Sequence, residues 1–251
     1  MKPMLAHKYN PLIDYTGWYM SEKLDGVRST YCDRQFMSRN EKQFLQSKGF
    51  DKSFPQNITL DGELFGGRGT FNETSGICRK KYNRDWSSLK YYVFEIPNFI
   101  TPFKHTISYL NSNIRNRYNN LIVLPQTICS SKEHLQRFFE RVITEGGEGV
   151  MLRHPDSYYE EGKRSSFLLK VKRFHKATCT VIGYENGKGK YSNVVGSLVC
   201  KFMNTTINIG SGLTDSDRIN PPEIGSFIQF RYFSLSKENI PRFPTFIKVL
   251  S

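Results

Sequence analysis

Closely spaced cysteines are missing from this chain. It has five cysteines in 251 residues, and no two of them form a Cys-x-x-Cys pair. Zinc sites and the disulfide frameworks of small secreted domains are usually built from such short spacings. The sequence therefore predicts no zinc site, and it predicts that the cysteines are reduced and serve as small, buried apolar side chains. They are Cys32, Cys78, Cys129, Cys179 and Cys200.

Long apolar segments are missing as well. No run approaches the roughly 20 apolar residues that are needed to cross a bilayer. Residues 1–7 lack the apolar core of a signal peptide, and no low-complexity tract occurs. Apolar residues nevertheless make up 38% of the chain, which is enough to form a core. These features predict a folded, cytoplasmic protein without a membrane partner.

Acidic residues are few relative to basic ones. The chain has 23 Asp and Glu residues against 36 Lys and Arg residues, which gives a formal net charge of +13. The basic residues are spread along the chain without a charged tail, so they belong to the surface of the folded body. Such an excess favours an anionic partner, above all a nucleic-acid backbone. The alternative is a basic surface that serves solubility alone.

In the first two thirds of the chain, segments whose apolar residues alternate as in a strand lie between segments whose apolar residues recur at helical spacing. A helix is expected between Ser131 and Gly146, and another over residues 103–118. Strands are expected at 17–33, in two pieces joined by a turn at 24–26, and at 58–65, 91–96, 149–153 and 167–173. This pattern predicts an α+β domain with antiparallel sheets and flanking helices.

After residue 174, apolar residues no longer recur at helical spacing. Short strands then alternate with turns rich in Gly, Asn and Pro. They are expected at residues 178–185, 196–203, 205–210, 226–233 and 246–250. Five short strands in a segment of this length predict a small β-barrel of the oligonucleotide-binding type, the OB-fold. The predicted domains are therefore residues 1–174 and 175–251.

One short segment, Lys23–Arg28, carries a lysine, a carboxylate, a glycine and an arginine directly after the aromatic run Gly17–Met20. A lysine at the end of an apolar strand, followed by a turn that contains glycine, is partly desolvated, held in place and flanked by charges. These are the conditions that a lysine nucleophile requires. The alternative interpretation is a solvated turn of mixed charge.

Two strands after this segment carry residues suited to a nucleotide. Glu63 follows Asp61-Gly62 on its strand and is placed to hold a ribose hydroxyl or a metal ion. Phe94 shares a strand face with Tyr92, which suits stacking on a flat heterocycle. The alternatives are a surface acid for Glu63 and an ordinary core aromatic for Phe94.

A carboxylate and two lysines later in the chain extend this set. Glu148 begins an apolar strand, where a carboxylate needs a cation, and Mg²⁺ is the natural one beside a phosphate. Lys170 and Lys172 lie on one side of a strand whose other side is apolar, and they repel each other unless an anion lies between them. The alternatives are a turn acid and a basic edge strand.

Two further runs are set aside. The run Gly187–Lys190 lacks the spacing and the strand-to-helix context of a Walker A phosphate loop. Thr214–Arg218 begins like a calcium loop but lacks its glycine and its final glutamate. A helix N-cap or a short turn explains the second run better.

Taken in order, the chemical segments resemble the motifs of nucleotidyltransferases that work through a lysyl-nucleotide, namely ATP-dependent DNA ligases, RNA ligases and mRNA capping enzymes. The matching segments are Lys23–Arg28, Leu60–Glu63, Tyr92–Glu95, Glu148–Arg153 and Leu168–Lys172. Other runs are similar to those of the minimal ATP-dependent DNA ligases of bacteria and viruses. These are Lys2–Ala6, Gly66–Gly69, Gly187–Tyr191, Ile209–Gly212 and Pro241–Pro244.

The resemblance implies an adenylation domain followed by an OB-fold DNA-binding domain. It implies that Lys23 attacks the α-phosphate of ATP and carries AMP as a covalent intermediate. Lys170 and Lys172 would bind that phosphate and favour the neutral amine of Lys23. AMP would then pass to the 5′-phosphate of a nick, where the 3′-hydroxyl displaces it, and Asp25 would assist as a second acid.

The resemblance also implies a binding site for each partner. Phe94 would stack on adenine and Glu63 would hold the ribose. The remaining nucleotide-binding residues would be Glu22, Arg28, Glu148, Lys170 and Lys172. Mg²⁺, replaceable by Mn²⁺, would bind at Glu63 and Glu148. Nicked duplex DNA would be bound by a monomer through Arg28, Arg39, Arg68, Lys188, Lys190 and Arg242.

Three features depart from the pattern of this family. Arg39-Asn40-Glu41 stands where the family usually has Arg-Asn-Gly, so an acid occupies the turn near the 5′-phosphate. The basic C-terminal motif of larger ligases has no full equivalent, and Arg242 and Lys248 are weak substitutes. The hairpin between Cys200 and Gly210 is too short for the insertion with which some viral ligases encircle DNA. We therefore expect the net positive charge to grip the DNA, with an affinity that falls steeply as salt rises.

Three rival functions are consistent with parts of the sequence. An mRNA-capping-type guanylyltransferase would share the core motifs and the barrel but prefer GTP. An RNA ligase would share the adenylation domain but usually not the barrel. A non-catalytic DNA-binding module would account for the charge and the barrel, but it would leave Lys23, Glu63 and Glu148 without a role.

Overall fold

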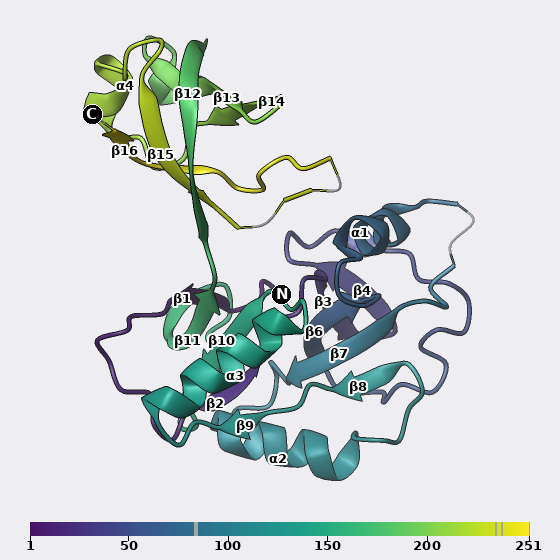
Figure 1. Cartoon of the computed structure of the whole chain (residues 1–251). Helices are drawn as coiled ribbons and strands as arrows, with labels where there is room; N and C mark the ends of the chain where they lie inside the picture. Colours follow the sequence, from purple (N-terminus) through teal and green to yellow (C-terminus); the bar gives the residue numbers. More distant parts are fainter. Residues whose placement is uncertain (83–84, 234, 237, 251) are drawn as a thin grey trace. The chain divides into compact units, whose positions relative to one another are not determined.

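The computed structural model describes residues 1–82, 85–233, 235–236 and 238–250. The chain forms two compact units, Met1–Lys172 and Arg173–Ser251, and each has its own hydrophobic core (Figure 1). The sequence places the domain boundary two residues later, between residues 174 and 175. No helix in the described ranges is both long enough and apolar enough to span a membrane.

Two sheets make up the first unit. The five-stranded sheet has the order β1-β11-β10-β2-β9, and the six-stranded sheet has the order β5-β4-β3-β6-β7-β8. Pairing is antiparallel except for β1 with β11 and β7 with β8. The first sheet contains β1 (Leu5–Lys8), β2 (Tyr19–Glu22), β9 (Thr127–Ile128), β10 (Gly149–Arg153) and β11 (Arg164–Lys172). The second contains β3 (Val27–Cys32), β4 (Gln35–Ser38), β5 (Gln43–Phe44), β6 (Leu60–Phe65), β7 (Lys90–Glu95) and β8 (Leu121–Val123).

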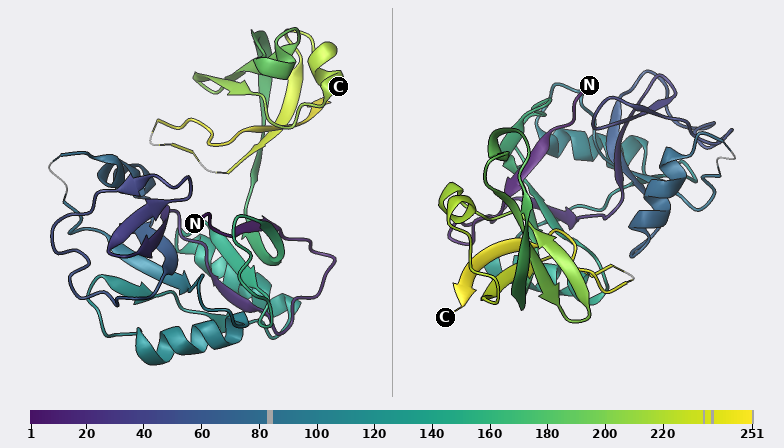
Figure 2. Two further views of the ribbon diagram at one scale, coloured as in Figure 1. Left: turned by 180° about the vertical axis from the view of Figure 1, so that it is seen from behind. Right: turned by 90° about the horizontal axis from the view of Figure 1, so that it is seen from above.

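Helices α1 (Phe71–Arg79), α2 (Phe103–Asn113) and α3 (Lys132–Thr144) accompany these sheets. Figure 2 shows them from two further directions; α2 packs on β7, and α3 packs on β10. The predicted helices α2 and α3 are confirmed, although α2 ends five residues before the predicted end. Helix α1 is not among the predicted elements, because few of its residues are apolar and it buries only Thr74, Ser75 and Cys78.

The second unit is a five-stranded barrel. Its order is β14-β13-β12-β15-β16, and a parallel bridge between Ser211 and Thr245 brings the two edge strands together. The strands are β12 (His175–Asn186), β13 (Val195–Phe202), β14 (Thr205–Ile209), β15 (Phe227–Tyr232) and β16 (Thr245–Leu250). The short helices η1 (Gly189–Tyr191) and α4 (Asp215–Ile219) lie in its loops, and Thr214 is the N-cap of α4. The predicted OB-fold is confirmed, and each of its five predicted strands is present.

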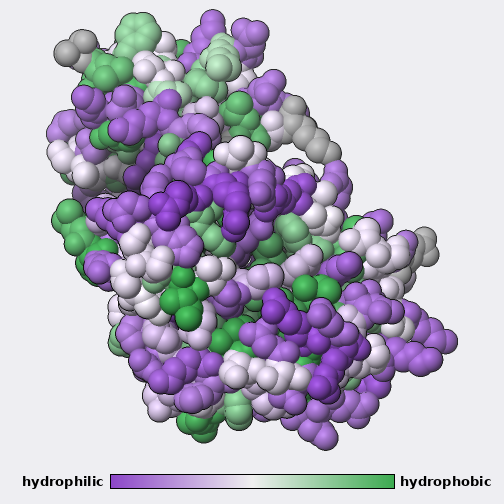
Figure 3. Space-filling view, turned by 60° about the horizontal axis from the view of Figure 1, so that its bottom comes forward, coloured by the Kyte–Doolittle hydropathy of each residue, from purple (hydrophilic) through white to green (hydrophobic). Residues whose placement is uncertain are grey.

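The molecular surface is mainly hydrophilic on the face in Figure 3, where apolar residues appear only in scattered patches. The apolar side chains are instead collected in three cores, one for each sheet of the first unit and one inside the barrel. Trp86 and Tyr91 are completely buried under the six-stranded sheet, and Phe230 is completely buried in the barrel. This separation is what the sequence predicts for a folded protein with a charged surface.

The turn between β2 and β3 connects the two sheets of the first unit. The sequence predicts two strands joined at residues 24–26, and the structure places these strands in different sheets. Gly26 lies against β6 so closely that a Cβ atom there would collide with the carbonyl oxygen of Leu64. The crossing therefore needs glycine, and it carries Lys23 into the space where the two sheets meet.

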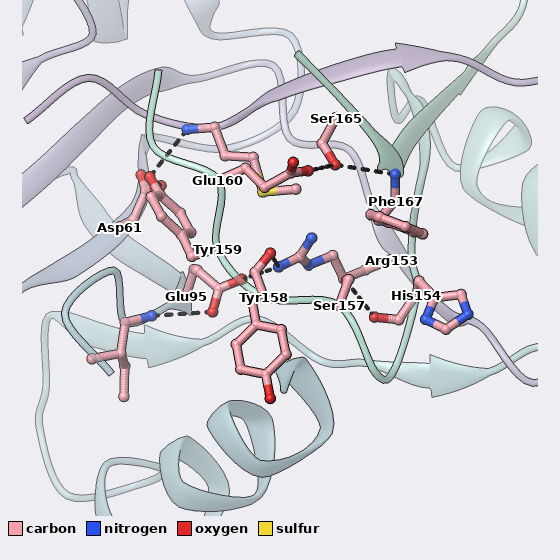
Figure 4. A network of polar contacts seen from close by, with 12 residues as sticks. Asp61, Glu95, Arg153, His154, Ser157, Tyr158, Tyr159, Glu160, Ser165 and Phe167 are labelled. Carbon is pink, nitrogen blue, oxygen red and sulfur yellow. Dashed lines mark hydrogen bonds and ion pairs between the residues drawn. The ribbon is translucent and has the colours of Figure 1, made fainter. Parts of the chain in front are cut away.

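A buried ion pair also joins the sheets. Arg153 Nη2 on β10 donates to Glu95 Oε2 on β7 at 3.1 Å (Figure 4). Both side chains are at most 7% exposed. The same nitrogen donates to the carbonyl oxygen of Tyr158 at 3.1 Å. Burial raises the pKa of Glu95 to about 7, although Arg153 opposes the shift. The pair fixes where β7 and β10 meet, at a cost in desolvation.

The raised pKa of Glu95 predicts a specific pH dependence of stability. A glutamate in an unfolded chain titrates near pH ~4.3, so between that pH and about 7 the folded state binds more protons. Stability therefore falls as pH rises through this window. At about 1.4 kcal/mol per pKa unit, we expect wild type to lose roughly 3 kcal/mol more than Glu95→Gln between about pH 4 and pH 8. Urea unfolding of both proteins measures the difference; equal pH dependence would contradict the prediction.

Candidate active site

Glu148 lies between two lysines in the first unit. One of its oxygens contacts Nζ of Lys23 and the other contacts Nζ of Lys172. The Glu148 side chain is only 4% exposed, whereas the lysines are 24% and 21% exposed. A nearly buried carboxylate thus faces two ammonium groups that solvent and ligands can still reach.

The backbone of the five-stranded sheet brings Lys23 and Lys172 close to Glu148. The amide of Lys23 donates to the carbonyl oxygen of Gly149 at 2.8 Å, directly beyond the paired residues Glu22 and Val150. Lys172 pairs with Gly149 on the other side of β10. Gly149 has φ +153°, and a Cβ atom there would collide with the carbonyl oxygen of Val171. Strands β2 and β11 can therefore bring their lysines to the residue just before β10 only because that strand starts with glycine.

A third lysine belongs to the same group. Lys170 lies two residues before Lys172 on β11, so the alternation of the strand places both on one side. Partial burial lowers the pKa of Lys170, and the positive charges of Lys172, Arg164, Lys23 and Lys8 lower it further. The concentration of positive charge that the sequence predicts here is present, and it favours an anion.

Arg28 is held rigidly on the six-stranded sheet. Its Nε and Nη2 each donate to one oxygen of Asp61 at 2.6 Å, and its Cζ lies 4.5 Å from the centroid of the Phe94 ring. Arg28 and Phe94 are both predicted site residues, but their mutual stacking is not predicted and Asp61 has no predicted role. Asp61 faces an arginine on the neighbouring strand β3 that is 33 residues away along the chain, and such a pair leaves no local signal in the sequence.

Asp61 is itself supported from a distant segment. The Tyr159 hydroxyl donates to Asp61 Oδ2 at 2.7 Å and accepts from the amide of Met4 at 3.1 Å (Figure 4). The Asp61 side chain is completely buried. Buried carboxylates are stable only where hydrogen bonds and opposite charges replace water, and this one has both.

Glu63 is the second carboxylate that faces the lysines. It pairs in register with Arg28 on β3 and Tyr92 on β7. Desolvation raises the pKa of Glu63 to about 7; Lys23 and Arg28 oppose the rise, and Glu148 adds to it. The carboxyls of Glu63 and Glu148 are therefore close enough to affect each other electrically.

These two carboxylates fit a magnesium ion in its usual coordination. Within the described residues, no group of three or more His, Cys, Asp or Glu side chains is arranged to hold a metal ion. Magnesium sites generally combine one or two protein carboxylates with substrate phosphates and water, however. Glu63 and Glu148, beside three lysines, match that combination.

Three other predicted site residues, Asp25, Glu22 and Arg68, lie near Lys23 in the sequence or in the fold. Asp25 is half-buried in the β2–β3 crossing. Glu22 accepts from the guanidinium of Arg68, with Nε and Nη2 each 2.9 Å from a carboxylate oxygen. Arg68 also donates to Glu145. Glu22, predicted as a nucleotide contact, is thus an ion-pair partner of Arg68, predicted as a DNA contact.

The departure from the family at residues 39–41 keeps the turn intact. Arg39 is exposed between β4 and β5. Glu41 adopts φ +59°, which is the left-handed region that glycine occupies most easily. Its amide donates to the carbonyl oxygen of Ser38 at 2.9 Å, so the turn closes with glutamate where the family has glycine.

The remaining predicted DNA contacts belong to the barrel unit. Lys188 and Lys190 are exposed beside η1, and Lys190 Nζ lies 4.5 Å from the Tyr191 ring centroid. Arg218 packs near the same ring, at 4.3 Å. Arg242 is half-exposed near β16, with its Cζ 5.6 Å from the Phe243 ring centroid. Each of these loops combines cations with an aromatic ring, which suits a phosphate backbone.

Comparison with known families gives matches to both units. Residues 3–172 match the ATP dependent DNA ligase domain, and residues 186–249 match the DNA ligase OB-like domain. A DNA ligase of Haemophilus influenzae is 38% identical over 246 residues, covering 97% of this chain and 90% of that protein. A DNA ligase of Methanopyrus kandleri is 34% identical over 39% of this chain, and the match spans only 18% of that longer protein.

Solved structures agree with these matches. A structure described as a Lig E DNA ligase superposes with a TM-score of 0.91 at 30% identity, covering 100% of this chain and 99% of that one. A Chlorella virus DNA ligase-adenylate has a TM-score of 0.57 at 25% identity, with coverage of 100% and 98%. The similarity therefore extends over both units.

The Asp61 contacts predict a large stability effect. We expect Asp61→Asn to lower the free energy of unfolding by about 3–5 kcal/mol, because it breaks a buried pair and leaves Arg28 with an unpaired charge. Asp156→Asn is the matched control, since Asp156 forms an exposed pair with Lys104 at 2.7 Å, and its loss should change the free energy of unfolding far less. Urea unfolding measures both; similar losses in the two variants would contradict the prediction.

Proposed function

The chain belongs to the ATP-dependent DNA ligases, and from this premise we propose that it seals nicks in duplex DNA through AMP carried on Lys23. The observation that carries the proposal is the contact of one nearly buried carboxylate, Glu148, with both Lys23 and Lys172. A charged turn without a catalytic role would not need a carboxylate that is withdrawn from water to hold its lysine.

In the first step, Nζ of Lys23 attacks the α-phosphorus of ATP. The N–P bond forms while the bond to the pyrophosphate oxygen breaks, and pyrophosphate leaves. Lys23 first loses one proton to solvent and attacks as the neutral amine. The Glu148 oxygen that contacts Nζ is placed to accept the second proton, which the nitrogen loses as the N–P bond forms. Lys170 and Lys172 balance the charge of the phosphate as the bonds change.

Arg28, Phe94 and Glu63 are proposed to hold the nucleotide. The Phe94 ring stacks on adenine, and the guanidinium of Arg28 already lies over that ring. The adenine therefore either takes the other face of the ring or displaces the guanidinium. Glu63 holds the ribose, and Glu22 orients the segment before Lys23 through its pair with Arg68.

Mg²⁺ or Mn²⁺, when held at Glu63 and Glu148, supplies charge neutralisation for the phosphates. The protein's own part is to keep both carboxylates beside the lysines. In the following steps AMP moves to the 5′-phosphate of the nick, and the 3′-hydroxyl then displaces it as the strand is sealed. Asp25 assists that hydroxyl, and Arg28 and Arg39 hold the 5′-phosphate.

The DNA is held mainly by charge. Lys188, Lys190 and Arg242 contact the phosphate backbone from the barrel, and Arg68 contributes from the first unit. The chain has a net charge of +13, so binding releases many counterions and weakens as salt rises. Because one chain carries every group in this scheme, we infer that a monomer suffices.

The adenylation step gives the direct test. Wild-type protein incubated with Mg²⁺ and ATP labelled on the α-phosphate, without DNA, should acquire a covalent label that survives denaturing electrophoresis. Lys23→Ala should acquire none, because it lacks the nucleophile. Lys132→Ala, which removes an exposed lysine at the start of α3, should be labelled like wild type. A labelled Lys23→Ala protein would refute the assignment, and labelling by GTP in place of ATP would favour a capping enzyme.

Salt dependence tests the proposed DNA contacts. We expect the logarithm of the affinity for nicked duplex DNA to fall linearly with the logarithm of salt concentration. Lys188→Ala and Lys190→Ala should each make the slope shallower by about 1, because each removes one phosphate contact. Lys104→Ala, an exposed lysine paired with Asp156, is the control and should keep the wild-type slope. Fluorescence anisotropy at several salt concentrations measures the slopes, and salt-independent binding would contradict the proposal.

A further inference from the structure

Arg68 lies in a loop that packs against the segments of the nucleophile and of its carboxylate partner. The loop joins β6 to α1 and contains Gly67 and Gly69 on either side of Arg68, with φ +116° and +75°. These left-handed conformations fold the loop back on itself, as glycine permits. The same strand β6 carries Glu63, so Arg68 is five residues beyond a group of the proposed nucleotide site.

The first partner of Arg68 is the residue directly before Lys23. Nε donates to Glu22 Oε1 and Nη2 to Glu22 Oε2, both at 2.9 Å. This is the paired geometry in which a guanidinium holds a carboxylate most firmly. The end of β2 is thereby connected to the end of β6, although these strands belong to different sheets.

The second partner lies three residues before Glu148. Nη1 donates to the carbonyl oxygen of Glu145 at 2.9 Å, and Nη2 donates to its carboxylate at 3.1 Å. Glu145 is the C-cap of α3, where carbonyl groups lack partners within the helix and a cation is favoured. Arg68 therefore supplies both a hydrogen-bond donor and a positive charge to the end of α3.

The turn between Glu145 and Glu148 is packed tightly against its neighbours. The amide of Gly147 donates to the carbonyl oxygen of Val142 at 2.7 Å. A Cβ atom on Gly147 would lie 2.9 Å from Glu22 Oε1. Glu22 and this turn are therefore in close contact, and Arg68 holds both.

From this geometry we propose that Arg68 is a positioning residue for adenylation, which holds Lys23 and Glu148 in register before any DNA is bound. Four hydrogen bonds from one guanidinium join the two segments that carry these residues to the loop after Glu63. Arg68 acts through Glu22 and Glu145, and the proposal requires no contact between Arg68 and ATP. This inference rests on the proposed function of Lys23, and it adds a role to Arg68 that a DNA contact alone does not provide.

The test measures adenylation without DNA. Single-turnover rates of label transfer from ATP are compared for wild type, Arg68→Ala and Arg68→Lys at a range of ATP concentrations. At saturating ATP we expect Arg68→Ala to be about 10- to 100-fold slower, because small misplacements of reacting groups have effects of this size. The KM for ATP should change little, since no nucleotide contact is lost. Arg68→Lys should recover only part of the rate, because an ammonium cannot make the paired bonds.

Three further variants test whether Arg68 acts by positioning rather than through its charge or the stability of the fold. Arg137→Ala removes an exposed arginine from α3 and should adenylate like wild type. Glu145→Gln should slow adenylation less than Arg68→Ala does, because the Glu145 carbonyl still accepts from Arg68. The double variant Arg68→Ala/Glu145→Gln should be no slower than Arg68→Ala, since both changes remove one connection. Thermal unfolding of each variant shows whether the fold is retained.

The outcomes distinguish this inference from the function on which it rests. If wild type formed no adenylate, the function of Lys23 would fail and the inference with it. If wild type and Arg68→Ala adenylated equally fast while nick binding was weaker in the variant, Arg68 would be a DNA contact only, and the positioning role would be wrong. An equal slowing in Arg137→Ala would also overturn it, because net charge would then explain the effect.

Discussion

The contact of Glu148 with Lys23 and Lys172 is the interaction on which the rest of the candidate site depends. Lys170 and Lys172 come from β11 and Lys23 directly follows β2, and without a carboxylate between them their repulsion would drive these segments apart. Glu148 itself is nearly buried and would be unfavourable there without the ammonium groups. Each charged side chain is therefore stable in its position only when the others are present, so the four residues depend on one another.

The same principle recurs where the two sheets of the first unit meet. Arg28 with Asp61 lies within the six-stranded sheet, and Arg153 with Glu95 joins it to the five-stranded sheet. Buried pairs of this kind add little net stability, because desolvation offsets the attraction between the charges. They restrict geometry strongly, however, since a shift of either sheet would leave a charge unpaired in a medium of low polarity. The position of Lys23 on the crossing between the sheets follows from that restriction.

Local pattern was sufficient for most of the fold. The alternation in β6, β7, β10 and β11 and the barrel strands could be predicted because a strand with one buried face must alternate. The order of the motif segments identified the candidate nucleophile. The partners of the ion-paired side chains could not be predicted, because the two residues of each pair are far apart in the sequence. The separations are 33 residues for Arg28 and Asp61, 46 for Arg68 and Glu22, and 58 for Arg153 and Glu95. Helix α1 was missed for a related reason, since neighbours in the fold rather than its own apolar residues hold it.

Charge balance gives a physical reason for gathering three lysines around one acid. Before reaction, Lys23, Lys170, Lys172 and Glu148 together carry three positive charges and one negative, a net charge of +2. In the proposed adenylate Lys23 is neutral and the phosphate adds one negative charge. Once Glu148 has passed the proton taken from Lys23 on to solvent, two positive charges face two negative ones and the net charge is zero. The excess that favours the approach of an anion is removed by the reaction, and pyrophosphate loses part of the attraction that brought the triphosphate in. In the proposed mechanism, nucleotide capture and release of the leaving group would both follow from one arrangement of charges, which Glu148 stabilises through its contacts with Lys23 and Lys172.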